Sequence, residues 1–100
     1  MKTYRLVLTE TADRDLQDLL AFTDITFGPQ QRVVYRDKIH KAFKRLQSMP
    51  NIGHLRKDIP KEMKSYTVGQ HSIIYRMNES QQEIFIYRIL HVRMDFTDKV

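Results

Sequence analysis

The chain has 100 residues, no cysteine and a formal net charge of +5. We expect one domain spanning residues 1–100, which excludes a large multidomain enzyme. The 41% hydrophobic fraction, with three glycines and three prolines, excludes a disordered or collagen-like chain. The absence of cysteine excludes disulfides and thiolate chemistry. The sequence also has no apolar run long enough to span a bilayer and no signal-peptide pattern. Together with the absence of cysteine, these features favour a cytoplasmic protein without membrane contact.

The basic excess is concentrated in one part of the chain. Residues 29–48 contain six basic side chains against one acidic, whereas residues 1–28 contain three against five. A patch of this kind is either a solvated helix face that keeps the protein soluble, or a docking surface for an acidic protein segment or for nucleic-acid phosphates. On the second interpretation, the docking side chains are Arg36, Lys38, Lys41, Lys44 and Arg45.

The first half of the sequence has the pattern of one strand and two helices. Alternating apolar residues predict a strand near residues 3–8. Apolar side chains at helical spacing follow, with Thr9 or Thr11 placed to cap the helix. The sequence Phe27-Gly28-Pro29 predicts the end of this helix and the start of another, because glycine tolerates the left-handed region and proline fits a first helical turn. The second helix ends at Met49-Pro50-Asn51-Ile52-Gly53, so the two helices should form a hairpin.

The second half predicts a long connection over residues 50–63 and then three strands, at 64–68, 72–77 and 83–90. The short links between these strands are typical of antiparallel neighbours. The last strand is apolar on both faces, which predicts a central position in the sheet. The fold class is therefore α+β, in the order β-α-α-β-β-β, with the helical hairpin packed on a small curved antiparallel sheet. We expect residues 96–100 to be a loose tail.

Few side chains carry a pattern that indicates chemistry. There is no glycine-rich phosphate loop, and no HExxH or GxSxG motif. The four histidines are not spaced as metal ligands, so we expect neither a metal site nor a cofactor. The carboxylates of the first helix are explained by its dipole and by solvation.

The remaining candidates are a carboxyl-terminal group, Arg88, His91, Arg93 and Asp95, together with Arg76 one strand away. Arg88 lies between apolar neighbours and needs an acceptor, because an unpaired buried guanidinium is costly. It therefore either forms a salt bridge with a helix carboxylate, such as Asp15 or Asp18, or reaches solvent. Alternatively, Arg76, His91 and Arg93 line the open side of the sheet and grip a phosphate, with His91 as proton donor.

The order of elements and several short motifs together resemble a known toxin family. The motifs are Phe27-Gly28-Pro29, Met49-Pro50-Asn51-Ile52-Gly53, His71-Ser72-Ile73-Ile74-Tyr75 and the closing Tyr87-Arg88-Ile89-Leu90-His91-Val92-Arg93-Met94-Asp95. From about Tyr4 to Asp95, the chain resembles the ParE branch of the RelE/ParE superfamily. The resemblance implies the toxin of a bacterial type II toxin–antitoxin system, neutralised by a ParD-like antitoxin whose carboxyl-terminal segment wraps the toxin.

The two branches of this superfamily imply different targets. ParE-type toxins inhibit DNA gyrase and hence replication, whereas RelE-type toxins cut mRNA in the ribosomal A site. RelE-like proteins place an arginine and paired lysines on the sheet. Here the arginine position matches Ser72, and the second lysine position falls near Tyr66. Their catalytic tyrosine near the carboxyl end has no counterpart in this chain. Only Arg93 matches well, so the resemblance favours gyrase.

We therefore predict a gyrase-inhibiting toxin without sequence-specific DNA binding of its own. Its target-binding residues would be Arg88, His91, Arg93, Met94 and Asp95. The alternative is a ribosome-dependent mRNA endonuclease that would use His71, Arg76, His91 and Arg93. A plain nucleic-acid-binding module would rest only on the pI of about 9.6.

Overall fold

The computed structural model describes residues 3–94 and residue 96, and its element order is the predicted one. Each strand boundary lies within two residues of the expectation. The elements are β1 (Arg5–Leu8), α1 (Glu10–Phe27), α2 (Pro29–Ser48), β2 (Lys64–Val68), β3 (His71–Asn78) and β4 (Glu83–His91).

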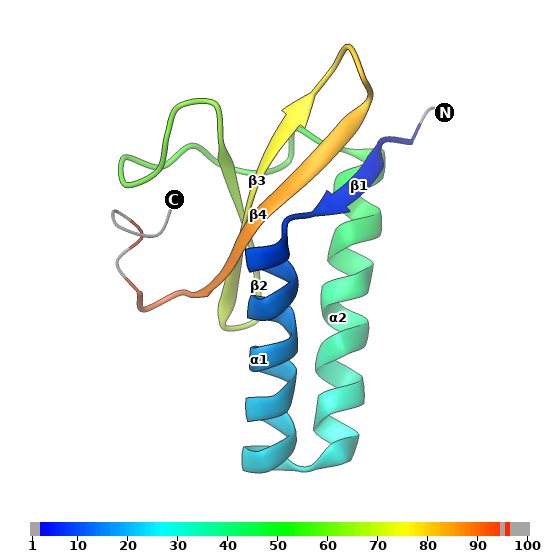
Figure 1. Cartoon of the computed structure of the whole chain (residues 1–100), viewed down its shortest axis with the longest axis vertical. Helices are drawn as coiled ribbons and strands as arrows, with labels where there is room; N and C mark the ends of the chain where they lie inside the picture. The colour runs from blue at the N-terminus through cyan, green and yellow to red at the C-terminus, as the bar shows by residue number, and fades with distance from the viewer. Residues whose placement is uncertain (1–2, 95, 97–100) are drawn as a thin grey trace.

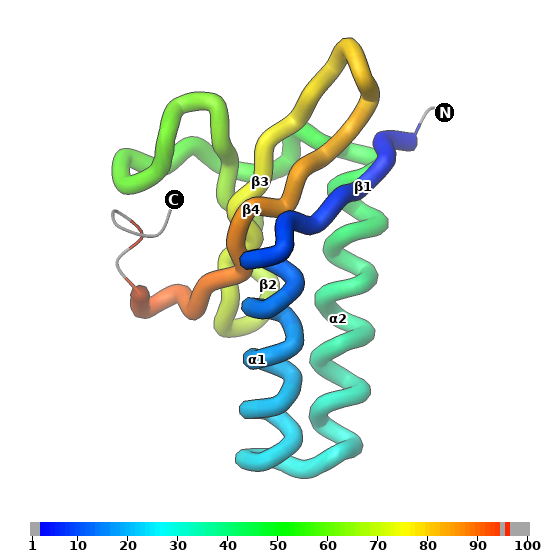
Figure 2. Tube along the Cα trace, viewed as in Figure 1, coloured from blue at the N-terminus to red at the C-terminus, as the bar shows by residue number. Residues whose placement is uncertain are grey.

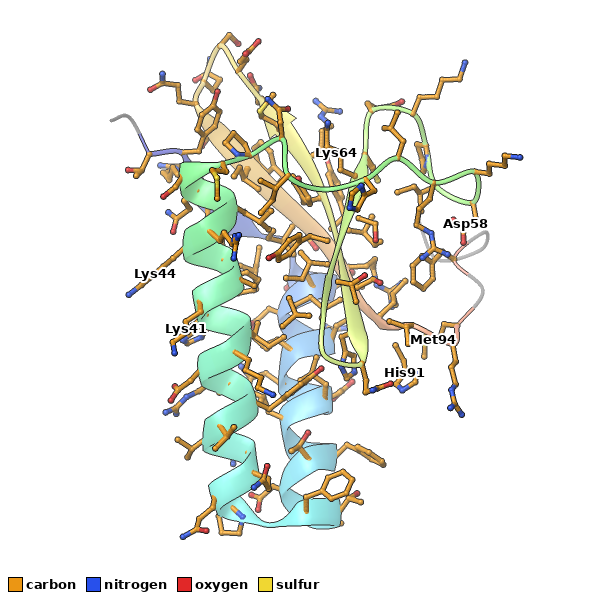
Figure 3. The ribbon with its side chains drawn as sticks, turned by 180° about the vertical axis from the view of Figure 1, so that it is seen from behind. Lys41, Lys44, Asp58, Lys64, His91 and Met94 are labelled. Atoms are coloured by element: carbon orange, nitrogen blue, oxygen red, sulfur yellow. The ribbon has the colours of Figure 1, made fainter. Side chains whose placement is uncertain are left out.

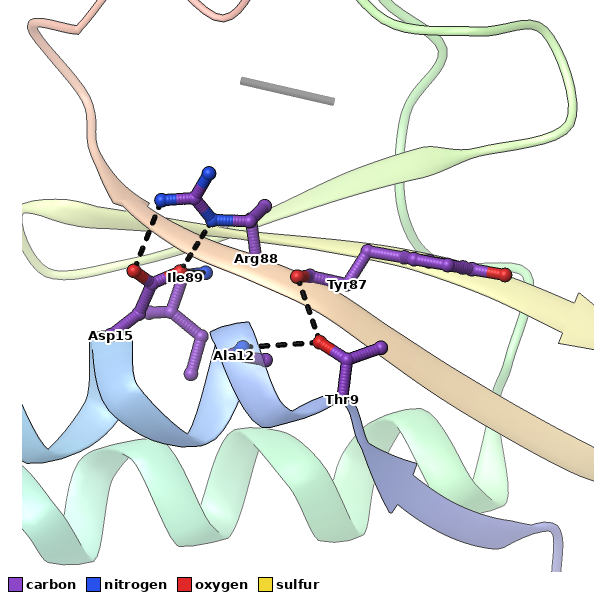
Figure 4. Close-up of polar contacts among 6 residues, drawn as sticks. All are labelled: Thr9, Ala12, Asp15, Tyr87, Arg88 and Ile89. Carbon is purple, nitrogen blue, oxygen red and sulfur yellow. Dashed lines mark hydrogen bonds and ion pairs between the residues drawn. The ribbon is translucent and has the colours of Figure 1, made fainter.

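Local hydrogen bonds fix both ends of α1. Thr9 is the cap: its hydroxyl accepts from the Ala12 N–H at 3.1 Å and donates to the Tyr87 carbonyl at 3.1 Å, which ties the start of the helix to β4 (Figure 4). Gly28 ends the helix with φ at 98°, a region that glycine enters without steric cost, and its N–H donates to the Asp24 carbonyl at 2.9 Å. Pro29 then opens α2, as predicted.

The four strands form one sheet in the order β1-β4-β3-β2 (Figure 1). The predicted central position of β4 is confirmed. The sheet is mixed, however, and not entirely antiparallel, because β1 pairs with β4 in parallel while the other two pairs are antiparallel. A parallel pair needs a long connection, and here the whole helical hairpin and the two other strands lie between the partners.

Both faces of the sheet are covered by apolar side chains. The helical hairpin packs on one face, where Ile39, Leu46, Ile73, Ile84 and Ile86 are fully buried. The opposite face holds a smaller cluster, made of Ile59, Ile74, Leu90 and Phe96. The expectation of a loose tail is therefore wrong for Phe96, whose ring is fully buried on this second face, and residues 97–100 lie outside the described part.

The connection over residues 50–63 covers the second face. The Arg56 guanidinium lies 4.2 Å from the centre of the Phe96 ring and donates twice to the Asp58 carboxylate, at 2.7 Å in each case. The buried Tyr75 hydroxyl donates to the Pro50 carbonyl at 2.7 Å and accepts from the Gly53 N–H at 2.9 Å. These contacts hold the long connection against the sheet.

The helical hairpin is longer than the sheet that it covers. Figures 1 and 2 show the turn between α1 and α2 lying well beyond the sheet. Large apolar side chains are exposed there, with Phe22 64%, Ile25 87% and Phe27 66% accessible. No helix within the described residues is both long and apolar enough to cross a membrane.

Candidate functional site

Arg88 belongs to the contact between α1 and the sheet. Its Nε and Nη2 donate to the two oxygens of Asp15, at 2.8 and 3.1 Å, and the Ile89 N–H donates to the same carboxylate at 3.0 Å (Figure 4). The hydrogen bond with Asp15 raises the pKa of Arg88 above its ordinary value. Of the two predicted helix partners, Asp15 is the one found, and Asp18 is exposed.

The other predicted target-binding residues lie at the end of β4 and just beyond it. His91 is the last residue of β4, and its Nδ1 accepts from the Arg93 N–H at 3.1 Å. Arg93 and Met94 are exposed, and Asp95 lies outside the described residues. Figure 3 shows Met94 just beyond His91. Arg88 is thus held against α1, while Arg93 and Met94 are accessible to a partner.

The residues proposed for RNA cleavage are only partly brought together. His71 and His91 are paired across β3 and β4, with ring centres 5.4 Å apart. Arg76 is paired with Phe85, five residues further along β3 from His71, which corresponds to about 16 Å of strand. A single phosphate therefore cannot lie between Arg76 and the histidine pair. Within residues 3–94 and 96, no three potential ligands gather as a metal site.

The histidine pair lines a hollow of about 440 Å³ that the sequence did not predict. Its apolar wall comes from the overhanging hairpin, with Phe22, Phe27 and Val34. Its polar end contains Tyr35, Lys38, His71 and His91. We call this the apolar hollow. The sequence signal for it is a pair of phenylalanines near the end of α1: Phe22 lies off the buried stripe of that helix, and Phe27 continues the stripe beyond its last buried residue, Leu20.

The predicted basic surface on α2 divides into two parts. Lys38, Lys41 and Arg45 line a shallower hollow of about 270 Å³, which we call the basic groove, with β2 as its other wall. Arg36 and Lys44 do not line it. Lys41 and Lys44 both project outward from α2 (Figure 3), and β2 is an edge strand of the described sheet.

Comparisons with known proteins agree with this fold over nearly the whole chain. A family model described as the ParE toxin of the type II toxin–antitoxin system parDE matches residues 6–96. Toxin ParE1 of Mycobacterium tuberculosis is 28% identical over 91 residues, which cover 91% of this chain and 92% of that toxin.

Two solved structures are similar in shape. The chromosomal ParDE toxin–antitoxin system of P. aeruginosa aligns with a TM-score of 0.76 and 25% identity, over 91% of this chain and 98% of the matched one. The toxin–antitoxin complex RelBE2 of Mycobacterium tuberculosis aligns with a TM-score of 0.66 and 25% identity, over 89% and 98%.

The fold and these similarities define the class as the toxins of type II toxin–antitoxin systems. Within that class, the chain belongs to the ParE toxin family. The resemblance found in the sequence is confirmed, and so is the α+β fold with its element order.

Proposed function

We propose that this toxin acts in the bacterial cytoplasm by inhibiting DNA gyrase. The ParE family membership supports this target. The observation that favours this choice over RNA cleavage is that Arg76, one of the four residues of the endonuclease alternative, lies far along β3 from His71 and His91, so that the four cannot act together on one phosphate. The exposed Arg93 and Met94 then form the target-binding end of the chain.

The antitoxin is expected to neutralise the toxin by placing an acidic segment in the basic groove. Lys38, Lys41 and Arg45 supply the positive charge on one side. On the other side lies the edge strand β2, whose Ser65 already exchanges two backbone hydrogen bonds with His54. An extended segment can therefore add to β2 beyond Ser65, beside the residues that line the groove, Tyr66, Thr67 and Val68. Charge and strand addition together favour a ParD-like antitoxin with an acidic, partly extended carboxyl-terminal part.

Two parallel assays of the purified chain test the target. We expect inhibition of DNA supercoiling by gyrase and accumulation of cleaved DNA, with both effects abolished by the antitoxin encoded beside the toxin gene. In ribosome reactions, we expect mRNA to stay intact. Cuts at the A-site codon, together with normal supercoiling, would overturn the gyrase proposal in favour of the endonuclease.

A further inference from the structure

The hydrogen bonds around Tyr35 favour the tautomer of His71 that carries its proton on Nδ1. The Tyr35 hydroxyl lies 3.1 Å from the Val68 carbonyl, 3.1 Å from the Gln70 N–H and 2.6 Å from His71 Nδ1. A hydroxyl has one proton to donate and two lone pairs to accept with. The Val68 carbonyl can only accept and the Gln70 N–H can only donate. All three contacts are therefore satisfied when Tyr35 donates to Val68 and His71 donates from Nδ1.

This arrangement leaves the second nitrogen of His71, Nε2, as an acceptor in the neutral ring. A partner that also only accepts, such as a carboxylate, can bind there only if Nε2 gains a proton. Protonation at Nε2 breaks none of the contacts that the structure shows for the ring. His91 differs, because its Nδ1 already accepts from the Arg93 N–H, and a proton on that atom would displace this bond.

The charges around the ring call for an acidic partner. Of the elements that wall the apolar hollow, α1 contributes no titratable side chain, α2 contributes Tyr35 and Lys38, and β4 contributes His91. No described residue lining the hollow carries a carboxylate. Burial, and then the nearby His91, lower the pKa of His71 below its ordinary value, so the ring is neutral at pH 7 in the free toxin.

The hollow also borders the proposed antitoxin site. Lys38 lines both the apolar hollow and the basic groove, so one docked segment can occupy the two. The exposed Phe22, Phe27 and Val34 offer apolar contacts to the same segment. The occupant that fits is a segment with apolar side chains next to a carboxylate.

We propose that His71 is a proton-linked recognition site for the antitoxin, at which a carboxylate of the docking segment binds protonated Nε2 while apolar side chains of that segment fill the hollow. The inference rests on the proposed neutralisation by an acidic antitoxin segment. It adds that the complex takes up a proton on forming.

The direction of the pH dependence follows from linkage. The bound carboxylate raises the pKa of His71 in the complex above its value in the free toxin. Affinity therefore increases as the pH falls through the pKa of the complex, by at most about tenfold per pH unit for one proton, and levels off below the pKa of the free toxin.

Titration calorimetry of the full-length toxin with the antitoxin encoded beside it tests this. Binding heats are measured at pH 7 in buffers of different ionisation enthalpy, which gives the number of protons exchanged. We expect the wild type to take up a proton, and His71→Gln, which keeps a neutral donor near Nε2, to bind without proton uptake and with little pH dependence. His40→Gln is the matched control, because His40 is exposed on α2 outside the hollow, and it should behave as the wild type.

A second measurement makes the test independent of the stability of the variant. The His71 ring of the wild type is titrated by NMR, free and in the complex, and its pKa should rise on binding. An unchanged pKa, or wild-type binding without proton uptake, would overturn the inference and leave antitoxin neutralisation intact. Failure of the wild type to bind the antitoxin would remove the proposed neutralisation and this inference with it.

Discussion

At the residue scale, Asp15 is the side chain that joins α1 to the central strand. It accepts two hydrogen bonds from Arg88 and one from the Ile89 backbone, and its side chain is 15% exposed. We expect Asp15→Ala to lower the free energy of unfolding by about 3 kcal/mol, since it leaves a shielded guanidinium and a backbone N–H without this acceptor. Urea denaturation measures the change. Asp18 is exposed, so Asp18→Ala should change the free energy of unfolding by less than about 0.5 kcal/mol. Equal losses of stability in the two variants would contradict the role of Asp15 in joining α1 to β4.

A second residue-scale prediction concerns the end of β4. Arg93 is exposed and has no described contact through its side chain that would stabilise the fold. We expect Arg93→Ala to lose most of its toxicity in growth assays and its gyrase inhibition, with an unchanged melting temperature. Arg76→Ala, which removes an exposed arginine from β3, should stay toxic. Full toxicity of Arg93→Ala would exclude Arg93 from the target-binding residues.

The need of Arg88 for a partner could be predicted from the sequence, because it lies in an apolar strand. The choice of Asp15 over Asp18 required the structure, since it depends on how α1 is rotated against the sheet. Asp15 precedes the buried Leu16 and lies beside β4, whereas Asp18 is on the solvent side.

At the element scale, the basic groove gives a prediction about charge. The double change Lys41→Glu and Arg45→Glu should weaken antitoxin binding by about 10- to 100-fold and reduce its salt dependence, because both side chains face the proposed acidic segment. Calorimetry at several salt concentrations measures both effects. The control is Lys57→Glu with Lys61→Glu, the same change of charge at two exposed residues outside the groove. Similar affinity and salt slope in the two double variants would rule out the groove as the docking surface.

Helices and strands could be predicted because their patterns are local. The breaks at Gly28 and at Pro50 were visible in the sequence, and the alternation of apolar residues located the strands. The parallel pairing of β1 with β4 could not be predicted, because the sequence of a four-residue strand does not indicate which strand it joins or in which direction. Phe96 was missed for a related reason: its ring packs with Ile59 and Ile74, which are distant in sequence, as well as with the nearby Leu90.

At the scale of the whole molecule, the second face of the sheet depends on an ion pair over Phe96. The hydrogen bond with Arg56 lowers the pKa of Asp58 below its ordinary value. A carboxylate whose pKa is lower in the folded state contributes stability above its unfolded pKa of about 3.9, and the contribution is lost as the pH falls through the folded value. Melting temperatures of the wild type and Asp58→Asn should therefore differ at pH 7 and converge in acid. A difference that stays constant down to pH 2.5 would contradict this role.

The apolar hollow is also a property of the whole molecule, because the residues that line it come from α1, α2 and the sheet. The sequence did not predict it for this reason. It exists because α1 and α2 extend beyond the sheet (Figure 1), so that Phe22 and Phe27 line the same hollow as His71 and His91. The lengths of the helices could be predicted, but their overhang depends on where the hairpin sits along the sheet. The proximity of the two histidines likewise required the register of β3 with β4.

The parallel pairing of β1 with β4 has a consequence for synthesis on the ribosome. Residues 5–8 are translated more than 70 residues before their partners, residues 83–86. Until β4 has left the ribosome, β1 has no strand beside it and the apolar face of the hairpin has no sheet to cover it. A nascent chain cut short before residue 83 therefore cannot build this sheet, because β1 still lacks its partner strand.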